Sequence, residues 1–147
     1  MPLTTTVDTA NFPLCDRLSL AASRLDVFCK EFRQRAWLAN AGHLPPYRRG
    51  LEIPVEQSLP LGLSGHNSDY SELEISVESG DTLTFFSDGV VEARNTTGEL
   101  FGFDRAAALS TDSAAKIAKT AELFGQEDDI TVLTLTFSGV PALQPQN

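Results

Sequence analysis

The sequence has no long apolar run and no recognisable targeting segment. No stretch of it approaches the roughly 20 apolar residues that a membrane helix needs. The first residues, MPLTTTVDTANFPLCDRL, do not join a basic segment to an apolar one, as a signal peptide would. We therefore expect a cytoplasmic protein with no membrane partner.

Cysteine is scarce, which limits the metal sites that the chain can build. The two cysteines, Cys15 and Cys29, are compatible with one disulfide, but free thiols fit a reducing cytosol better. Neither lies at a spacing from histidine or from the other cysteine that is typical of a zinc site.

Basic charge is scarce beyond residue 50. Residues 51–147 contain four Lys or Arg and sixteen Asp or Glu, a net charge of −12, whereas residues 1–50 contain seven and four, a net charge of +3. We therefore expect no nucleic-acid partner. An acidic excess is either a solvated face or a surface suited to divalent cations, and composition does not distinguish the two.

The length of 147 residues fits one domain, and the hydrophobic pattern predicts an α+β fold. Alternating or apolar segments predict strands at 36–42, 51–55, 70–78, 82–87 and 130–137. Residues 70–87 form a predicted hairpin with a turn at 79–81, where Asp81 has a turn role. Pro54 places the second strand at an edge.

Helices are predicted at 16–35, 103–110 and 113–125, the last starting at a capping residue and ending at Gly125. For part of the first segment, SRLDVF, a strand is the alternative. Residues 1–15 are expected to be a loose leader, residues 43–50 and 56–69 loops, and residues 138–147 a flexible tail.

Two acidic motifs lie at predicted strand ends. Asp88 and Gly89 follow the strand at 82–87, and Asp128 and Asp129 precede the strand at 130–137. If these strands are antiparallel neighbours, Asp88 and Asp128 converge. Converging carboxylates repel each other unless a cation lies between them, and Mg²⁺ or Mn²⁺ prefers oxygen ligands. On spacing alone, however, ordinary turn chemistry is the favoured interpretation.

Four motifs in order resemble the second half of a bacterial metal-dependent phosphatase domain. They are LANAGHLPPYRRG, LPLGL, SGDTLTFFSDGVVEARNTTGELFGFDR and QEDDITVLTLTF, within residues 36–137. The resemblance is to the SpoIIE-like branch of the PPM serine/threonine phosphatases. It implies part of an α–β–β–α sandwich that is incomplete on the N-terminal side. Residues 1–35 are then a divergent or truncated segment.

The resemblance also implies a function and a site. Two Mn²⁺ or Mg²⁺ ions would activate a water that hydrolyses phosphoserine or phosphothreonine, and no phosphoenzyme would form. Asp88 and Asp128 match the metal ligands of the SDG and DDIT motifs. Gly89, Asp129, Asn40 and His43 take supporting positions, although for His43 a structural turn role is equally compatible. The expected substrate is a phosphorylated signalling protein such as an anti-sigma-factor antagonist.

One motif of the family is missing from the chain. The family carries an earlier Asp-Gly pair whose carboxylate bridges both metals, whereas Asp88 and Gly89 form the only Asp-Gly pair here. Three explanations are open: a fragment of a longer enzyme, a degenerate relative, or a second chain that supplies the missing layer. An inactive phosphatase-like binding module in a sigma-factor pathway is therefore the alternative function, and a simple cation-binding domain is a third.

Overall fold

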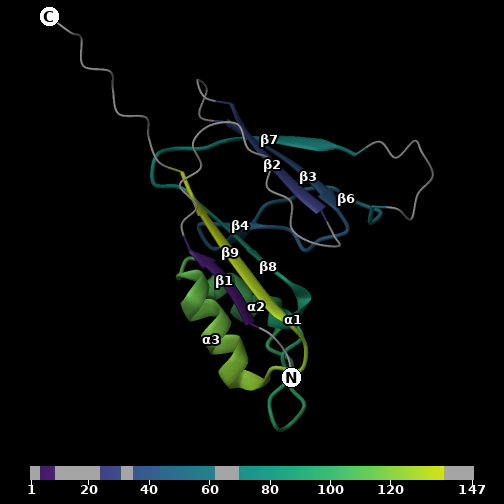
Figure 1. Cartoon of the computed structure of the whole chain (residues 1–147), viewed down its shortest axis with the longest axis vertical. Helices are drawn as coiled ribbons and strands as arrows, with labels where there is room; N and C mark the ends of the chain where they lie inside the picture. Colours follow the sequence, from purple (N-terminus) through teal and green to yellow (C-terminus); the bar gives the residue numbers. More distant parts are fainter. Residues whose placement is uncertain (1–3, 9–23, 31–34, 62–69, 138–147) are drawn as a thin grey trace, which may run out of the picture.

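A computed structural model describes residues 4–8, 24–30, 35–61 and 70–137. Within these ranges the chain forms two β-sheets and three helices (Figure 1). We call the sheets the central sheet and the outer sheet, because the first lies between the helices and the second.

The central sheet is built mainly from the C-terminal part of the chain. Its strand order is β1–β9–β8–β4–β5, and β1 is parallel to β9 while the other pairs are antiparallel. The strands are β1 (Thr4–Asp8), β9 (Ile130–Thr136), β8 (Thr82–Phe86), β4 (Tyr47–Arg48) and β5 (Leu51–Glu52).

The outer sheet is organised around β3 (Arg35–Ala41). This strand is antiparallel to β2 (Arg24–Lys30) and to β7 (Glu72–Ser76), and its last residues are parallel to β6 (Gln57–Ser58). Among the described residues, no helix covers the face of this sheet that points away from the central sheet.

Side chains of alternating strand residues fill the space between the two sheets. Leu38 of β3, Leu83 and Phe85 of β8, and Leu133 of β9 are almost completely buried in this inter-sheet core. The alternation follows from the pleat, which directs successive side chains to opposite faces. Phe86 and Val132 therefore point to the other face of the central sheet.

That other face is covered by α1 (Asp88–Val91), α2 (Gly102–Leu109) and α3 (Ala114–Gly125) (Figure 1). The helix α3 buries small residues spaced along one side against β9, which lets the helix approach the sheet closely. Its N-cap is Ser113, whose hydroxyl accepts a hydrogen bond from the backbone N–H of Lys116.

Much of the predicted element pattern is confirmed. The strands at 36–42, 82–87 and 130–137, and both C-terminal helices, occur within a few residues of the expected bounds. The edge position of residues 51–55 is also confirmed, although only Leu51–Glu52 is a strand. None of the described helices is long and apolar enough to cross a membrane.

Four expectations are wrong. Residues 24–30 form β2 and not a helix, so the strand alternative holds there, and the expected loose leader contains β1. The expected loops contain the short strands β4 and β6. The predicted hairpin does not exist, because β7 pairs with β3 and β8 pairs with β9 and β4, in different sheets. The remaining leader, residues 16–23 and 31–34 of the predicted first helix, residues 62–69 of the second expected loop and the tail lie outside the described residues.

Candidate functional site

The acidic motifs lie at the adjoining ends of β8 and β9. These strands are antiparallel, with Phe86 opposite Val132, so the end of β8 lies beside the beginning of β9. Asp88 is the first residue of α1, directly after β8, and Asp128 lies two residues before β9. The pairing on which the convergence of Asp88 and Asp128 depends is thus confirmed.

Gly89 brings the two motifs into direct contact. A Cβ atom built on Gly89 would lie 2.3 Å from the carbonyl oxygen of Asp129 and 3.4 Å from that of Asp128. The backbone of the acidic segment therefore packs on the glycine at a distance that any side chain would prevent. This contact fixes the backbone next to each candidate ligand, and the supporting role of Gly89 and Asp129 stays a prediction.

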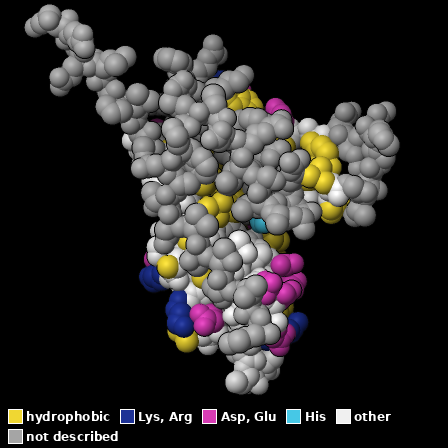
Figure 2. All heavy atoms as spheres, in the orientation of Figure 1, with side chains coloured by type: hydrophobic (Ala, Val, Ile, Leu, Met, Phe, Trp, Pro, Cys, Tyr) yellow, Lys and Arg dark blue, Asp and Glu magenta, His cyan; other side chains and the backbone are white. Residues whose placement is uncertain are grey.

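Both candidate ligands are exposed carboxylates. Asp88 Oδ1 accepts a hydrogen bond of 3.0 Å from the N–H of Gly89, and Asp128 Oδ1 accepts one of 2.7 Å from the N–H of Asp129. Figure 2 shows acidic side chains gathered on the side of the molecule where α1 and the beginning of β9 lie.

This donor set fits a hard divalent ion. Mg²⁺ is commonly bound through one or two carboxylates, with waters and phosphate oxygens completing its coordination. Within the described part of the chain no group of three His, Cys, Asp or Glu side chains is arranged to hold a metal. Asp88 and Asp128 therefore supply only part of a coordination shell, and their role as ligands stays a prediction.

A serine that the sequence did not single out joins the two strand ends. The hydroxyl of Ser87 donates a hydrogen bond of 3.1 Å to the carbonyl of Asp129 and accepts one of 2.9 Å from the N–H of Thr131. Its own N–H donates to the carbonyl of Thr131 at 2.9 Å. The sequence feature that could have indicated a role for Ser87 is its position, directly before the Asp-Gly pair at the end of a strand.

Asn40 and His43 form a closed loop after β3. The fully buried Asn40 side chain accepts from the N–H of His43 and donates to its carbonyl, both at 2.8 Å, and Gln57 donates to the same carbonyl. No hydrogen bond or ion pair in the described residues links Asn40 or His43 to Asp88 or Asp128. Their observed contacts are those of a structural turn.

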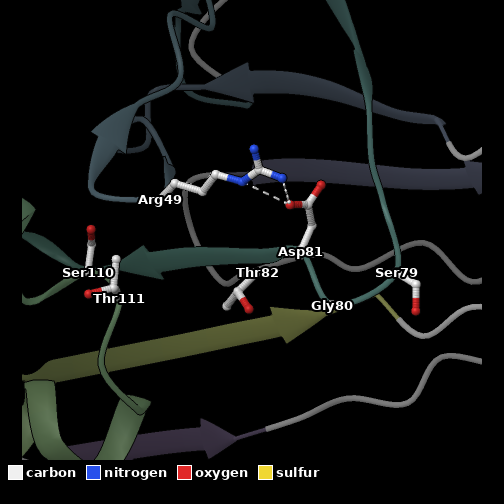
Figure 3. A pocket seen from close by; sticks show the side chains of 7 residues that line it. All are labelled: Arg49, Ser79, Gly80, Asp81, Thr82, Ser110 and Thr111. Carbon is white, nitrogen blue, oxygen red and sulfur yellow. Dashed lines mark hydrogen bonds and ion pairs between the residues drawn. The ribbon is translucent and has the colours of Figure 1, made fainter.

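A second charged cluster surrounds Asp81 at the other end of β8. Arg49 forms an ion pair with this buried carboxylate (Figure 3). Arg48 forms a second ion pair with it, and the carboxylate also accepts a hydrogen bond from the N–H of Glu78. Burial alone would raise the pKa of Asp81, but the Glu78 N–H and the two guanidinium groups hold it below its usual value. The turn role predicted for Asp81 is therefore correct, and the arginines add to it.

An open cavity of about 320 Å³ lies beside this cluster, lined by Arg49, Ser79, Gly80, Asp81, Thr82, Ser110 and Thr111 (Figure 3). The only cationic side chain in the lining is Arg49, and its Nε and one terminal nitrogen are bonded to Asp81. The positive charge in the lining is therefore already paired with Asp81.

The whole arrangement matches a known family. The model of the family described as Stage II sporulation protein E (SpoIIE) matches residues 14–138. The chain belongs to this family. The match confirms the resemblance noted in the sequence and explains why the acidic motifs occur in this order. Among curated protein sequences, none matches the chain.

Solved structures similar to the SpoIIE-family chain have the same fold. The SiaA-PP2C domain of Pseudomonas aeruginosa superimposes with a TM-score of 0.63 at 23% identity, over 79% of this chain and 52% of that one. The structure of the RsbU and RsbW domains of Rv1364c from Mycobacterium tuberculosis gives 0.58 and 21%, over 81% and 37%.

These matches confirm the predicted α+β, PPM phosphatase-like fold. The chain spans about half of the SiaA domain and a smaller share of the second structure. Of the four layers of the predicted sandwich, the described residues show three: the outer sheet, the central sheet and one layer of helices.

Proposed function

We propose that this chain is the C-terminal portion of a metal-dependent protein serine/threonine phosphatase of the SpoIIE type. Its substrate would be a phosphoserine or phosphothreonine of a signalling protein, and the phosphate would be transferred to water. Residues 36–137 would form the phosphatase-like portion, following a divergent N-terminal segment at 1–35.

One observation carries this proposal. In a chain of the SpoIIE family, antiparallel pairing of β8 with β9 brings the backbone of Asp128 and Asp129 against Gly89, the neighbour of Asp88. The two exposed carboxylates that match the family's ligand motifs thus belong to segments in direct contact. If the two motifs were ordinary turns with no shared role, their backbones would not need to be in contact.

The side chains at this site would bind and orient a divalent ion and the substrate phosphate. Mn²⁺ or Mg²⁺ held by Asp88 and Asp128 would supply a Lewis acid for the phosphoryl group and lower the pKa of the attacking water. Gly89 and Asp129 hold the two ligand segments together. Asn40 and His43 keep the loop at the end of β3 closed.

The partner and the compartment follow from the family resemblance. We propose a phosphorylated anti-sigma-factor antagonist as the substrate and the cytoplasm as the place of action. The C-terminal part of the chain is acidic, which is unfavourable for a nucleic-acid partner.

The test is Mn²⁺-dependent phosphate release from a phosphoserine peptide. Asp88→Asn and Asp128→Asn keep the side-chain shape but remove the charge. Each should lower turnover by about two orders of magnitude, because several kcal/mol of transition-state stabilisation depend on the ion. Asp112→Asn is the matched control, since Asp112 pairs with Lys116 at the start of α3. Equal turnover in all three variants would contradict the proposed site.

An inactive binding module is the second candidate. Its supporting observation is that no three metal-binding side chains come together in the described residues. In that case the chain would bind a phosphoprotein without hydrolysing it, and the binding would be insensitive to both Asp→Asn changes and to chelators. Turnover that requires Mn²⁺ and Asp88 would exclude this candidate.

A further inference from the structure

The segment that carries Asp128 is held at both ends by the segment that carries Asp88. At one end, the N–H of Arg94 donates to the carbonyl of Gly125 at 2.8 Å, and the Arg94 side chain lies 3.5 Å from the Glu127 carboxylate. At the other end, Ser87 bonds to Asp129 and Thr131. Between these points, the Asp129 carbonyl rests on Gly89.

The hydroxyl of Ser87 does not cap the helix that begins at the next residue. Ser87 is the N-cap residue of α1, and an N-cap serine usually accepts a hydrogen bond from an N–H in the first turn of its own helix. No such bond is present; the hydroxyl bonds instead to the Asp129 carbonyl and the Thr131 N–H of the opposite strand. The Ser87 hydroxyl therefore connects the end of β8 to the beginning of β9.

We propose that Ser87 is a positioning residue that sets the separation of the Asp88 and Asp128 carboxylates for divalent-ion binding. The inference rests on the proposed function, and it assigns a role to a residue that is not one of the proposed metal ligands. Ser87 adjoins Asp88 covalently, and its hydroxyl contacts the residue next to Asp128. A single side chain thus connects both ligand-bearing backbones.

The two ligand-bearing segments need this connection for an electrostatic reason. Two carboxylates that are brought toward one cation repel each other when the cation is absent, and this repulsion favours separation of the segments that carry them. Three hydrogen bonds oppose that separation: Ser87 donates to the carbonyls of Asp129 and Thr131, and its hydroxyl accepts from the N–H of Thr131. Groups that orient metal ligands typically change metal affinity by about 10-fold to 100-fold when removed.

The experiment measures Mn²⁺ affinity by calorimetric titration in the wild-type chain and in Ser87→Ala. We expect Ser87→Ala to bind Mn²⁺ about 10-fold to 100-fold more weakly. Ser87→Thr, which retains the hydroxyl, should restore the affinity, whereas Ser87→Val, which is isosteric with the threonine variant but lacks the hydroxyl, should not. Amide exchange at Thr131, measured without metal, should be faster in the Ala and Val variants and normal in the Thr variant.

Thr84→Val, in the strand β8 that leads to Ser87, is the matched control. The buried Thr84 hydroxyl donates a 2.7 Å hydrogen bond to the carbonyl of Ser110, away from the acidic motifs. This variant should lower the thermal midpoint but leave Mn²⁺ affinity unchanged. If Ser87→Ala does not fold, Ser87→Cys replaces it, because a thiol is a weaker donor and acceptor and should give an intermediate affinity.

The outcomes separate the inference from the function on which it rests. If the wild-type chain binds no Mn²⁺, the proposed function fails, and the role of Ser87 fails with it. If the wild type binds Mn²⁺ and Ser87→Ala or Ser87→Val binds it equally well, only the role of Ser87 is overturned. An equal loss of affinity in Thr84→Val would also overturn it, since the loss would then reflect general stability.

Discussion

At the scale of single residues, Asp81 shows how an ordinary turn aspartate becomes a stabilising centre. Its side chain is only 3% exposed, and it binds two arginines and the N–H of Glu78. The lowered pKa means that the folded state favours the ionised form more than the unfolded chain does. Ionised Asp81 therefore stabilises the fold fully above the ordinary Asp pKa of about 4. This contribution is lost as the pH falls through the lowered pKa of the folded state.

We predict that Asp81→Asn lowers the free energy of unfolding at pH 7 by about 2 kcal/mol, as expected for hydrogen bonds between charged groups. The cost stays below that of a fully buried pair because Arg49 is mostly exposed and can be hydrated again. Urea unfolding at several pH values measures this difference. It should be constant near neutral pH and should shrink in acid, whereas Glu78→Gln, at an exposed pair, should have little effect. A difference that grows in acid would contradict the assignment.

The candidate ligands at this scale were predictable, and the residues that hold them were not. Asp88 and Asp128 are recognisable because a carboxylate follows or precedes an apolar strand, and the motif order matches a family. The role of Ser87 depends on the direction of one hydroxyl, which sequence spacing does not specify. Arg48 and Arg49 reach Asp81 from more than thirty residues away, so local pattern could not connect them.

At the scale of elements, the hydrophobic pattern of the sequence predicted where strands occur better than it predicted which strands pair with each other. Residues 70–87 show alternation, a Gly-containing turn and a second apolar run, which together predict a hairpin. The chain instead crosses between sheets at this turn, because the half-buried Leu73 and Ile75 of β7 face the inter-sheet core together with Leu83 and Phe85 of β8. A hairpin would place both strands in one sheet and remove one side of that core. The choice between these arrangements depends on long-range packing.

The junction between α3 and β9 provides the prediction at this scale. Gly125 has φ of 147°, and a Cβ there would lie 1.8 Å from the carbonyl oxygen of Arg94. Gly125→Ala should therefore destabilise the fold by about 3 kcal/mol, from backbone strain and the steric clash together. Gly98→Ala is the control: Gly98 has φ of 80°, and a Cβ built there would meet no atom within 4 Å, so only strain of about 1 kcal/mol applies. Equal unfolding free energies for both variants would show that the junction relaxes and holds no fixed position.

At the scale of the whole molecule, the central sheet contributes to two cores at once. Its strands β8 and β9 direct Phe85 and Leu133 into the inter-sheet core, and Phe86 and Val132 toward the helices. The outer sheet and the three described helices lie on opposite faces of the central sheet (Figure 1). We therefore expect a destabilising change in one core to affect the other through the strands that the two cores share.

Because the two cores share β8 and β9, we predict one cooperative unfolding transition, with the same midpoint for two independent probes. The only tryptophan, Trp37, lies in β3 of the outer sheet, whereas circular dichroism at 222 nm follows mainly the helices on the opposite face. Phe86→Ala removes a side chain that is 2% exposed and stacks on Tyr47 at 5.1 Å on the helix side. It should cost about 3–5 kcal/mol and shift the fluorescence and dichroism midpoints together, since neither face holds its structure without the central sheet. Leu123→Ala, at a residue 74% exposed, should leave both midpoints in place. A fluorescence transition that stays at the wild-type midpoint while the dichroism transition moves would show that the outer sheet folds independently of the helices.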